Sequence, residues 1–254
     1  MPAPLVWLEP GDPFPPVAQA WGPGDAAPGL LAAGGNLTVR TLCAAYAQGI
    51  FPWYGAGQPT LWWSPDPRMV LATDAFRVHR SLRQTLRKFR ATPHCEIRVD
   101  TAFDRVIRGC AARERPGQSG TWILPEMIDA YCELHRAGFA HSVETWMNGE
   151  LAGGLYSVAL GRAVFGESMF SLQSDASKIA LAALIAFGRA HDISLIDCQQ
   201  NTAHLARLGA CEMARDQFVS HVQAAIRMTP PVWRFDSVYW NLLPELRTPT
   251  GDAP

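Results

Sequence analysis

The stretch AHSVETWMNGELAGGLYSVALGRAVFGESMFSLQSDASKIALAALIAFGRAHDISLIDC, residues 140–198, decides the fold. Its pattern predicts, in order, strands at 140–147, 151–159 and 163–170, a helix at 175–188 and a strand at 193–198. Asn148-Gly149 suits a type I′ hairpin turn between the first two strands. Because a crossover helix returns the chain in its original direction, the last two strands form a parallel pair. We therefore predict an α/β fold (α+β) with a mixed sheet.

The N-terminal region has a different character. Residues 1–30 are rich in Pro and Gly and read as irregular, and Thr38 can cap a short helix that Gly49 ends. The following IFPWYGAGQPTLWWSPDPR, residues 50–68, is expected to be an aromatic loop region. The change of composition after it predicts a small N-terminal domain at 1–66 and a larger domain at 67–254.

Composition excludes several protein classes. The chain has 254 residues and a formal net charge of −1, so it has no general attraction to nucleic acid or to anionic membranes. No segment approaches the ~18–20 apolar residues that cross a bilayer. The six cysteines are scattered, which indicates free thiols rather than disulfides or a zinc site. We expect a cytoplasmic protein without a membrane partner, metal or cofactor.

A basic stripe follows the predicted boundary. Residues 77–90 contain six Arg or Lys residues and no acid, on a predicted helix whose apolar positions form a separate face. A solvated helix face usually mixes both signs, whereas a run of one sign suits a phosphate backbone. The nearby tryptophans favour RNA over long DNA, because unpaired bases stack on aromatic rings. The candidate phosphate contacts are Arg80, Arg83, Arg87, Lys88 and Arg90.

Two short polar segments are candidates for chemistry. Glu167, in FGESMF, is either a structural acid or the receptor for a cationic group. In LIDCQ, residues 195–199, strand alternation predicts that Asp197 and Gln199 share one face and that Cys198 points to the other. Asp197 and Gln199 form either a structural hydrogen bond or a functional pair. Cys198 is a poor nucleophile if buried, because burial raises the pKa of a thiol.

Four motifs in this order resemble the leucyl/phenylalanyl-tRNA–protein transferase family: GIFPW at 49–53, WWSPDPR at 62–68, GESMF at 166–170 and LIDCQ at 195–199. The resemblance spans roughly 29–216, most of the chain. It implies a small N-terminal domain and a C-terminal domain similar to GNAT acyltransferases. It also implies transfer of Leu or Phe, less often Met, from aminoacyl-tRNA to proteins that begin with Arg or Lys. The product then carries an N-terminal residue that directs degradation.

The resemblance also implies roles for particular residues. Asp197 and Gln199 match the family's catalytic pair, and we hypothesise that Asp197 polarises the Gln199 amide, whose oxygen accepts a hydrogen bond from the attacking amine. Glu167 falls where an acid organises the site or receives the basic acceptor, and the basic stripe falls where the tRNA acceptor stem is expected. Residues matched to the terminal adenosine are Trp53, with Tyr46 and Trp122. Residues matched to the apolar side-chain pocket are Leu155, Phe165, Leu181, Leu184 and Ile196.

The chain departs from the family pattern at three positions. Asn36 and Arg207 replace the usual residues at sites expected to be peripheral, and Gly188 stands where an aromatic can line the pocket floor, so a roomier pocket is expected.

Two other functions stay open. A coenzyme A-dependent GNAT acetyltransferase would need a pyrophosphate loop, and the one match, Gln19–Gly24, lies in a Pro-rich segment. A non-catalytic module that binds tRNA or basic N-termini would not need Asp197 with Gln199.

Overall fold

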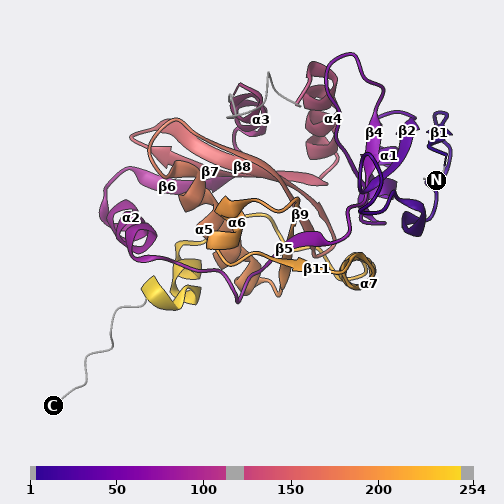
Figure 1. Cartoon of the computed structure of the whole chain (residues 1–254). Helices are drawn as coiled ribbons and strands as arrows, with labels where there is room; N and C mark the ends of the chain where they lie inside the picture. The colour runs from indigo at the N-terminus through magenta and orange to yellow at the C-terminus, as the bar shows by residue number, and fades with distance from the viewer. Residues whose placement is uncertain (1–3, 113–122, 247–254) are drawn as a thin grey trace.

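Two β-sheets organise the chain, which the computed structural model describes over residues 4–112 and 123–246 (Figure 1). A four-stranded sheet lies in the N-terminal part, and a seven-stranded sheet forms the centre of the larger C-terminal part. This arrangement confirms the mixed α/β class and the small N-terminal part. The division at 66/67 stays a prediction; the first strand of the larger sheet begins at Arg68.

The smaller sheet has the strand order β1-β2-β4-β3, with β1 parallel to β2 and the other pairs antiparallel. Its region comprises β1 (Val6–Leu8), η1 (Val17–Gln19), β2 (Leu30–Gly34), α1 (Val39–Tyr46), β3 (Phe51–Pro52) and β4 (Leu61–Trp63). The prediction of a loop across 50–68 is therefore wrong at β3 and β4. Trp62 is fully buried and its indole N–H donates to the Gly34 carbonyl at 2.9 Å, so packing makes this aromatic segment regular.

The larger sheet has the strand order β11-β5-β10-β9-β8-β7-β6. Its strands are β5 (Arg68–Ala72), β6 (Cys95–Val99), β7 (Ala140–Met147), β8 (Glu150–Leu160), β9 (Ala163–Ser171), β10 (Leu195–Gln199) and β11 (Cys211–Met213). Among the described strands of this larger sheet, only β9 and β10 pair in parallel, which confirms the predicted crossover. The sequence did not predict β5 and β11, which are short and complete the sheet beyond β10.

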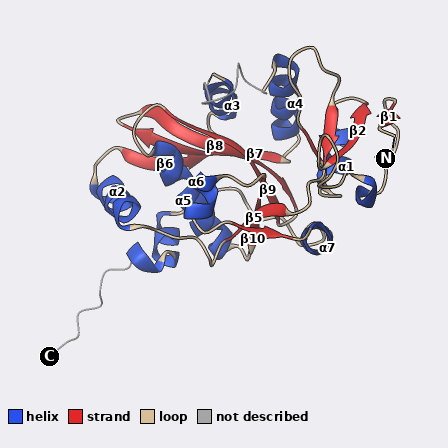
Figure 2. Cartoon of the chain, viewed as in Figure 1, coloured by secondary structure: helices blue, strands red, loops and turns tan. Residues whose placement is uncertain are grey.

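Helices cover both faces of the larger sheet (Figure 2). They are α2 (Arg80–Ala91), α3 (Phe103–Ala111), α4 (Pro125–Arg136), α5 (Ala176–Ala190), α6 (Ala203–Arg207) and α7 (Arg215–Ala225), followed by η2 (Ser237–Leu242) and η3 (Pro244–Leu246). One hydrophobic cluster joins α3, α4, α7 and the N-terminal part to one face, and the second joins α5, α2 and η2 to the other. The larger sheet therefore lies between two cores. None of the helices in the described ranges is long and apolar enough to span a membrane.

Local sequence explains the central elements. Asn148 and Gly149 have φ values of 53° and 79°, the positive values that a type I′ turn requires, and they join β7 to β8 as predicted. The crossover helix α5 is buried along most of its length, which explains its many Ala residues. The basic helix begins at Arg80 rather than at 77, because the Arg77 N–H bonds to the Leu208 carbonyl at 2.9 Å and keeps that segment extended.

Candidate active site

A cavity of about 560 Å³ lies where β9 and β10 separate. These strands pair only at Ile196–Val164 and Asp197–Phe165, so their later residues have no strand partner on that side and leave space between them. The helices α5 and α6 and the segment around Trp53 close this space. The apolar part of its wall consists of Leu155, Met169, Leu181, Leu184, Ile196 and Leu205.

A β-bulge at Cys198 changes which side chains face this cavity. Asp197 pairs with Val70 and Gln199 with the next residue of β5, Met69, so Cys198 is an extra residue in β10. Gln199 has a φ of 56°, the left-handed conformation that non-glycine residues rarely adopt. The cavity is consequently lined by Cys198 and Gln199, while Asp197 lies on the other side. The predicted alternation, with Asp197 and Gln199 on one face, is wrong because the bulge interrupts it.

Both carboxylate oxygens of Asp197 accept hydrogen bonds on the side of β10 that faces away from the cavity. Its two carboxylate oxygens accept hydrogen bonds from Nε and Nη2 of Arg68 at 2.7 and 2.6 Å, and both side chains are at most 1% exposed. One of those oxygens also accepts the Gln199 backbone N–H at 2.9 Å. The polarisation hypothesis needs correction on this point: Asp197 bonds to the backbone of Gln199 and not to its side-chain amide.

Arg68, which the sequence interpretation missed, connects Asp197 to the N-terminal part. Its guanidinium lies 4.7 Å from the Phe51 ring centroid and 4.6 Å from that of Phe218, and it donates to the Gly49 carbonyl at 3.0 Å. An arginine at the start of the apolar run MVLA was the available signal, because a buried charge requires a partner. That partner lies 129 positions away, beyond the reach of local patterns.

A second bulge, at Glu167 in β9, lies beside the first. Tyr156 pairs with Ser168 and Ser157 with Gly166, so Glu167 has no partner in β8. The Gln199 side-chain Nε2 donates to Glu167 Oε1 at 3.2 Å. Adjacent bulges on two strands thus aim a carboxyl group and an amide at each other at the cavity wall.

Two buried tyrosines support Glu167 from behind. The Tyr131 hydroxyl donates to Glu167 Oε2 at 3.4 Å, and it also shares a hydrogen bond with the Tyr46 hydroxyl. Burial is the main cause that raises the pKa of Glu167 to about 8; the negative charge of Asp197 adds to it, whereas Arg68 and the tyrosine bonds oppose it. Glu167 is therefore largely protonated at pH 7.

The structure brings together most of the residues that the resemblance implies. Trp53, Glu167, Gln199 and the apolar residues Leu155, Leu181, Leu184 and Ile196 line one cavity. Tyr46 does not reach it, because its side chain is fully buried behind Glu167. Phe165 lies on the opposite face, where its ring packs 5.0 Å from Tyr46 and 6.4 Å from Phe218, so its assignment to the side-chain pocket is wrong. Trp122 lies outside the described residues.

One further expectation is corrected at this site, and another is confirmed. Gly188 does not line the floor: a Cβ added there would meet Thr73 Cγ2 at 3.1 Å and the Ile193 carbonyl at 3.3 Å, so its replacement of an aromatic does not enlarge the cavity. Cys198 shares the cavity-facing side of β10 with Ile196, as predicted. Burial raises the pKa of its thiol far above the ordinary value, which keeps the thiol protonated and a poor nucleophile.

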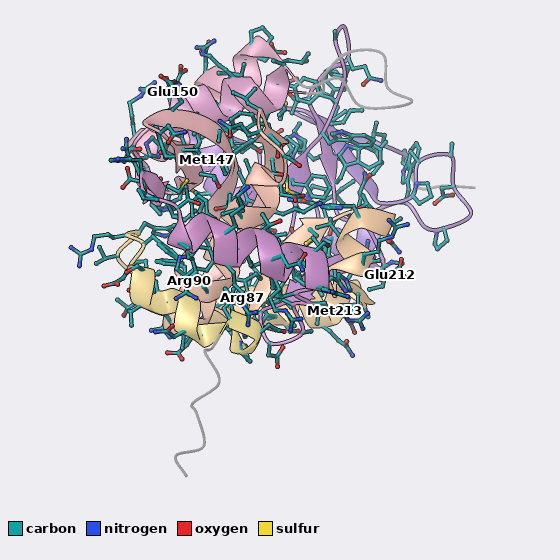
Figure 3. All side chains as sticks on the ribbon, turned by 90° about the vertical axis from the view of Figure 1, so that its left-hand side faces the viewer. Arg87, Arg90, Met147, Glu150, Glu212 and Met213 are labelled. Atoms are coloured by element: carbon teal, nitrogen blue, oxygen red, sulfur yellow. The ribbon has the colours of Figure 1, made fainter. Side chains whose placement is uncertain are left out.

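The basic helix α2 lies on the face of α5, away from the N-terminal sheet. Arg80, Arg87, Lys88 and Arg90 are exposed and Arg83 is partly exposed. Arg87 and Arg90 lie beside the C-terminal 3₁₀ helices and donate to the Glu245 and Leu246 carbonyls, both at 3.5 Å (Figure 3). Thus the end of the stripe at Arg87 and Arg90 contacts the C-terminal segment, and the end at Arg80 lies near α6.

An apolar cavity with a few converging polar groups is typical of a substrate-binding site. The profile described as Leucyl/phenylalanyl-tRNA protein transferase matches residues 70–223, and the one for its N-terminal domain matches residues 35–66. The chain belongs to the leucyl/phenylalanyl-tRNA–protein transferase family.

Relatives with this description match over almost the whole chain. The protein of Polaromonas sp. (strain JS666 / ATCC BAA-500) is 59% identical over 250 residues, which are 98% of each chain. That of Albidiferax ferrireducens is 62% identical over 242 residues, which are 95% of each chain. The solved structure of L-PGS from Bacillus licheniformis is 12% identical over 80% of this chain and 65% of that one, with a TM-score of 0.37.

Proposed function

We propose that this protein transfers Leu or Phe, and less readily Met, from aminoacyl-tRNA to the N-terminal Arg or Lys of acceptor proteins. The observation that carries the proposal is the single cavity in which Gln199 and Glu167 meet an apolar wall. Family membership supports the reaction class. The transferred residue would mark the acceptor for degradation in the cytoplasm, where aminoacyl-tRNA is made.

The apolar wall suits the transferred side chain. Leu155, Leu181, Leu184 and Ile196 offer carbon surface and no charge. Such a pocket separates side chains that differ by one methylene by only ~1–3 kcal/mol, so it accepts Leu, Phe and Met together. Branching at Cβ changes the shape next to the ester, and we expect Ile and Val to be rejected.

Gln199 is the residue we assign to the attacking amine. Because its Nε2 donates to Glu167, its Oε1 is left to accept a hydrogen bond from the amine. This hydrogen bond orients the nitrogen lone pair toward the ester carbonyl. Asp197 acts as a positioning residue: with Arg68, it holds the Gln199 backbone in the left-handed conformation that directs the amide into the cavity.

The chemistry needs little beyond this arrangement. An aminoacyl ester is already activated, and an α-amino group with a pKa of ~8 is partly neutral at pH 7. The amine nitrogen bonds to the carbonyl carbon, the ester C–O bond breaks, and the ribose oxygen leaves with the proton that the amine loses. Holding both substrates in one cavity makes the reaction nearly unimolecular, which supplies much of the rate.

The coenzyme A alternative finds little support. The sequence Gln19–Gly24 begins at the last residue of η1 in the N-terminal part and does not open a helix. The crossover helix α5 has Asp175 at its N-cap, where a pyrophosphate would meet a like charge. The Lys178 ammonium donates to that carboxylate at 2.6 Å, so this nearby cation is already engaged within the protein.

The test incubates the protein with leucyl-tRNA and a peptide that begins with Arg, and reads the peptide mass. We expect one leucine to be added to this peptide and none to a matched peptide that begins with Asp. Gln199→Ala should abolish most of the addition while tRNA binding persists. Binding of charged tRNA and peptide without any addition would favour the non-catalytic module. Acetylation by acetyl-coenzyme A would favour the GNAT acetyltransferase.

A further inference from the structure

The short helix α6 connects the cavity to the basic helix α2. Its N-cap Thr202 and its residues His204 and Leu205 line the cavity. Arg207, the last residue of α6, lies three residues after His204, about 5 Å farther along the helix axis. A ligand that leaves the cavity along α6 therefore meets Arg207 within the length of one helical turn.

The far end of α6 lies directly against the segment that leads into α2. The Arg207 carbonyl is 2.7 Å from His79 Nε2, and the Arg77 N–H donates to the Leu208 carbonyl at 2.9 Å. The Arg77 side chain passes over the turn after α6, since its Cγ lies 3.4 Å from the position of a Cβ on Gly209. Backbone contacts thus fix Arg77 and Arg207 on neighbouring segments.

These segments carry positive charge that no carboxylate of the described residues neutralises. Arg77, Arg80 and Arg207 are exposed and Arg83 is partly exposed. Across residues 4–112 and 123–246, no ion pair joins any of these four arginines to a carboxylate. A cluster of unpaired arginines on two adjacent backbones is suited to the phosphates of one RNA strand.

The two ends of the α2 stripe differ in what they contact. Arg87 and Arg90 donate to carbonyls of η3, which holds that end against the C-terminal segment. Within residues 4–112 and 123–246, the side chains of Arg80 and Arg83 make no such hydrogen bond to a carbonyl, and they lie at the end of α2 nearest to α6. The arginines without an ion pair among the described residues, Arg77, Arg80, Arg83 and Arg207, therefore lie where the start of α2 meets the end of α6.

From this geometry we infer that Arg207, with Arg77, binds phosphates of the unpaired 3′ end of the aminoacyl-tRNA as it enters the cavity. This inference rests on the proposed function, which requires the 3′ ester to reach Gln199. The strand would run from α2, past Arg77 and Arg207, and along α6. The expectation that Arg207 is peripheral is thereby replaced by a specific role in RNA binding.

The test measures the affinity of full-length protein for uncharged tRNA, without acceptor, over a series of salt concentrations. Arg207→Gln removes one charge at the end of α6, and Arg136→Gln is the matched control, because Arg136 is an exposed last residue of α4 on the other face of the sheet. Loss of one single-strand phosphate contact should lower the slope of log Kd against log salt by about 0.7, which corresponds to a roughly fourfold weaker affinity at 0.15 M salt. The control should bind as the wild type does.

A second RNA distinguishes the part of the tRNA that is bound. With a tRNA that lacks its unpaired 3′ nucleotides, Arg207→Gln should bind as tightly as the wild type. An unchanged salt slope with intact tRNA would overturn the inference, and so would a loss that persists with the shortened tRNA. Neither result affects the proposed function, which is judged separately by leucine transfer in the wild-type protein.

Discussion

Arginine side chains occupy two opposite environments in this protein. Arg68 is completely buried, held by a carboxylate, a backbone carbonyl and two aromatic rings. Arg80 and Arg207 are exposed, and no carboxylate among the described residues pairs with them. We propose from this difference that the buried arginine fixes the geometry of the protein, whereas the exposed ones bind the tRNA. The following changes test that distinction, in order of decreasing expected effect.

Removing Arg68 should cost the most stability. Arg68→Met leaves Asp197 buried without its partner, and breaking such a pair costs about 3–5 kcal/mol. The free energy of unfolding in urea measures the loss. The double variant Arg68→Met/Asp197→Leu, which leaves no unpaired charge, should recover much of it. A loss below about 1 kcal/mol in the single variant would mean that Arg68 resembles the exposed arginines.

Glu167 should make stability depend on pH. Its pKa is raised from 4.5 to about 8 in the folded protein, so the folded state holds this proton more tightly than the unfolded state. The contribution is full below pH 4.5 and is lost as pH rises through 8. Allowing for partial exposure, the wild type should lose about 3 kcal/mol more than Glu167→Gln between pH 5 and pH 8. Parallel stability curves for the two proteins would contradict a buried, protonated Glu167.

Gln199 should separate activity from stability. Gln199→Ala and Gln199→Gly both remove the amide, and each should slow single-turnover leucine transfer by about 100-fold. Since residue 199 has a φ of 56°, Gly should be more stable than Ala by about 1 kcal/mol. Chemical denaturation of the two variants checks this order. Wild-type transfer in Gln199→Ala would show that the amide does not act on the amine.

The exposed stripe should have the smallest effect on the fold. Arg83→Ala combined with Arg87→Ala should change the free energy of unfolding by no more than about 0.5 kcal/mol. If both bind phosphates, the salt slope of tRNA binding should fall by about 1.4–1.8. Unfolding in urea and a salt titration give the two results. A wild-type slope with intact stability would identify the stripe as a solvated helix face.

The sequence was most informative where the structure follows a local pattern. Strand β7 has the predicted bounds, and the Asn148-Gly149 turn and the crossover helix α5 follow from residues close in the chain. The parallel pairing of β9 with β10 then follows from general topology. These elements contain the candidate site, so the fold around it could be predicted without distant contacts.

The details of the site required information from partner strands. A bulge depends on how two strands align, so neither the Cys198 bulge nor the Glu167 bulge has a signature in its own strand. Strict alternation consequently put Asp197 beside Gln199 in the prediction. The pairing of Arg68 with Asp197 joins residues that are 129 positions apart, which no local pattern reveals. The family resemblance assigned Phe165 to the pocket, whereas its ring packs on the opposite face against Tyr46 and Phe218. The sequence predicted which segments form the candidate site, but it did not predict which way their side chains point.

The cavity takes its floor and its polar groups from separate elements. Leu181 and Leu184 belong to the helix α5, whereas Glu167 and Gln199 belong to two strands and are held by their own hydrogen bonds. A substitution on the helix can therefore reshape the cavity without moving the amide or the carboxyl group. Under the proposed assignment, mutation can alter the substrate range in small steps while the reaction is preserved, and α5 is the place to engineer transfer of unnatural amino acids.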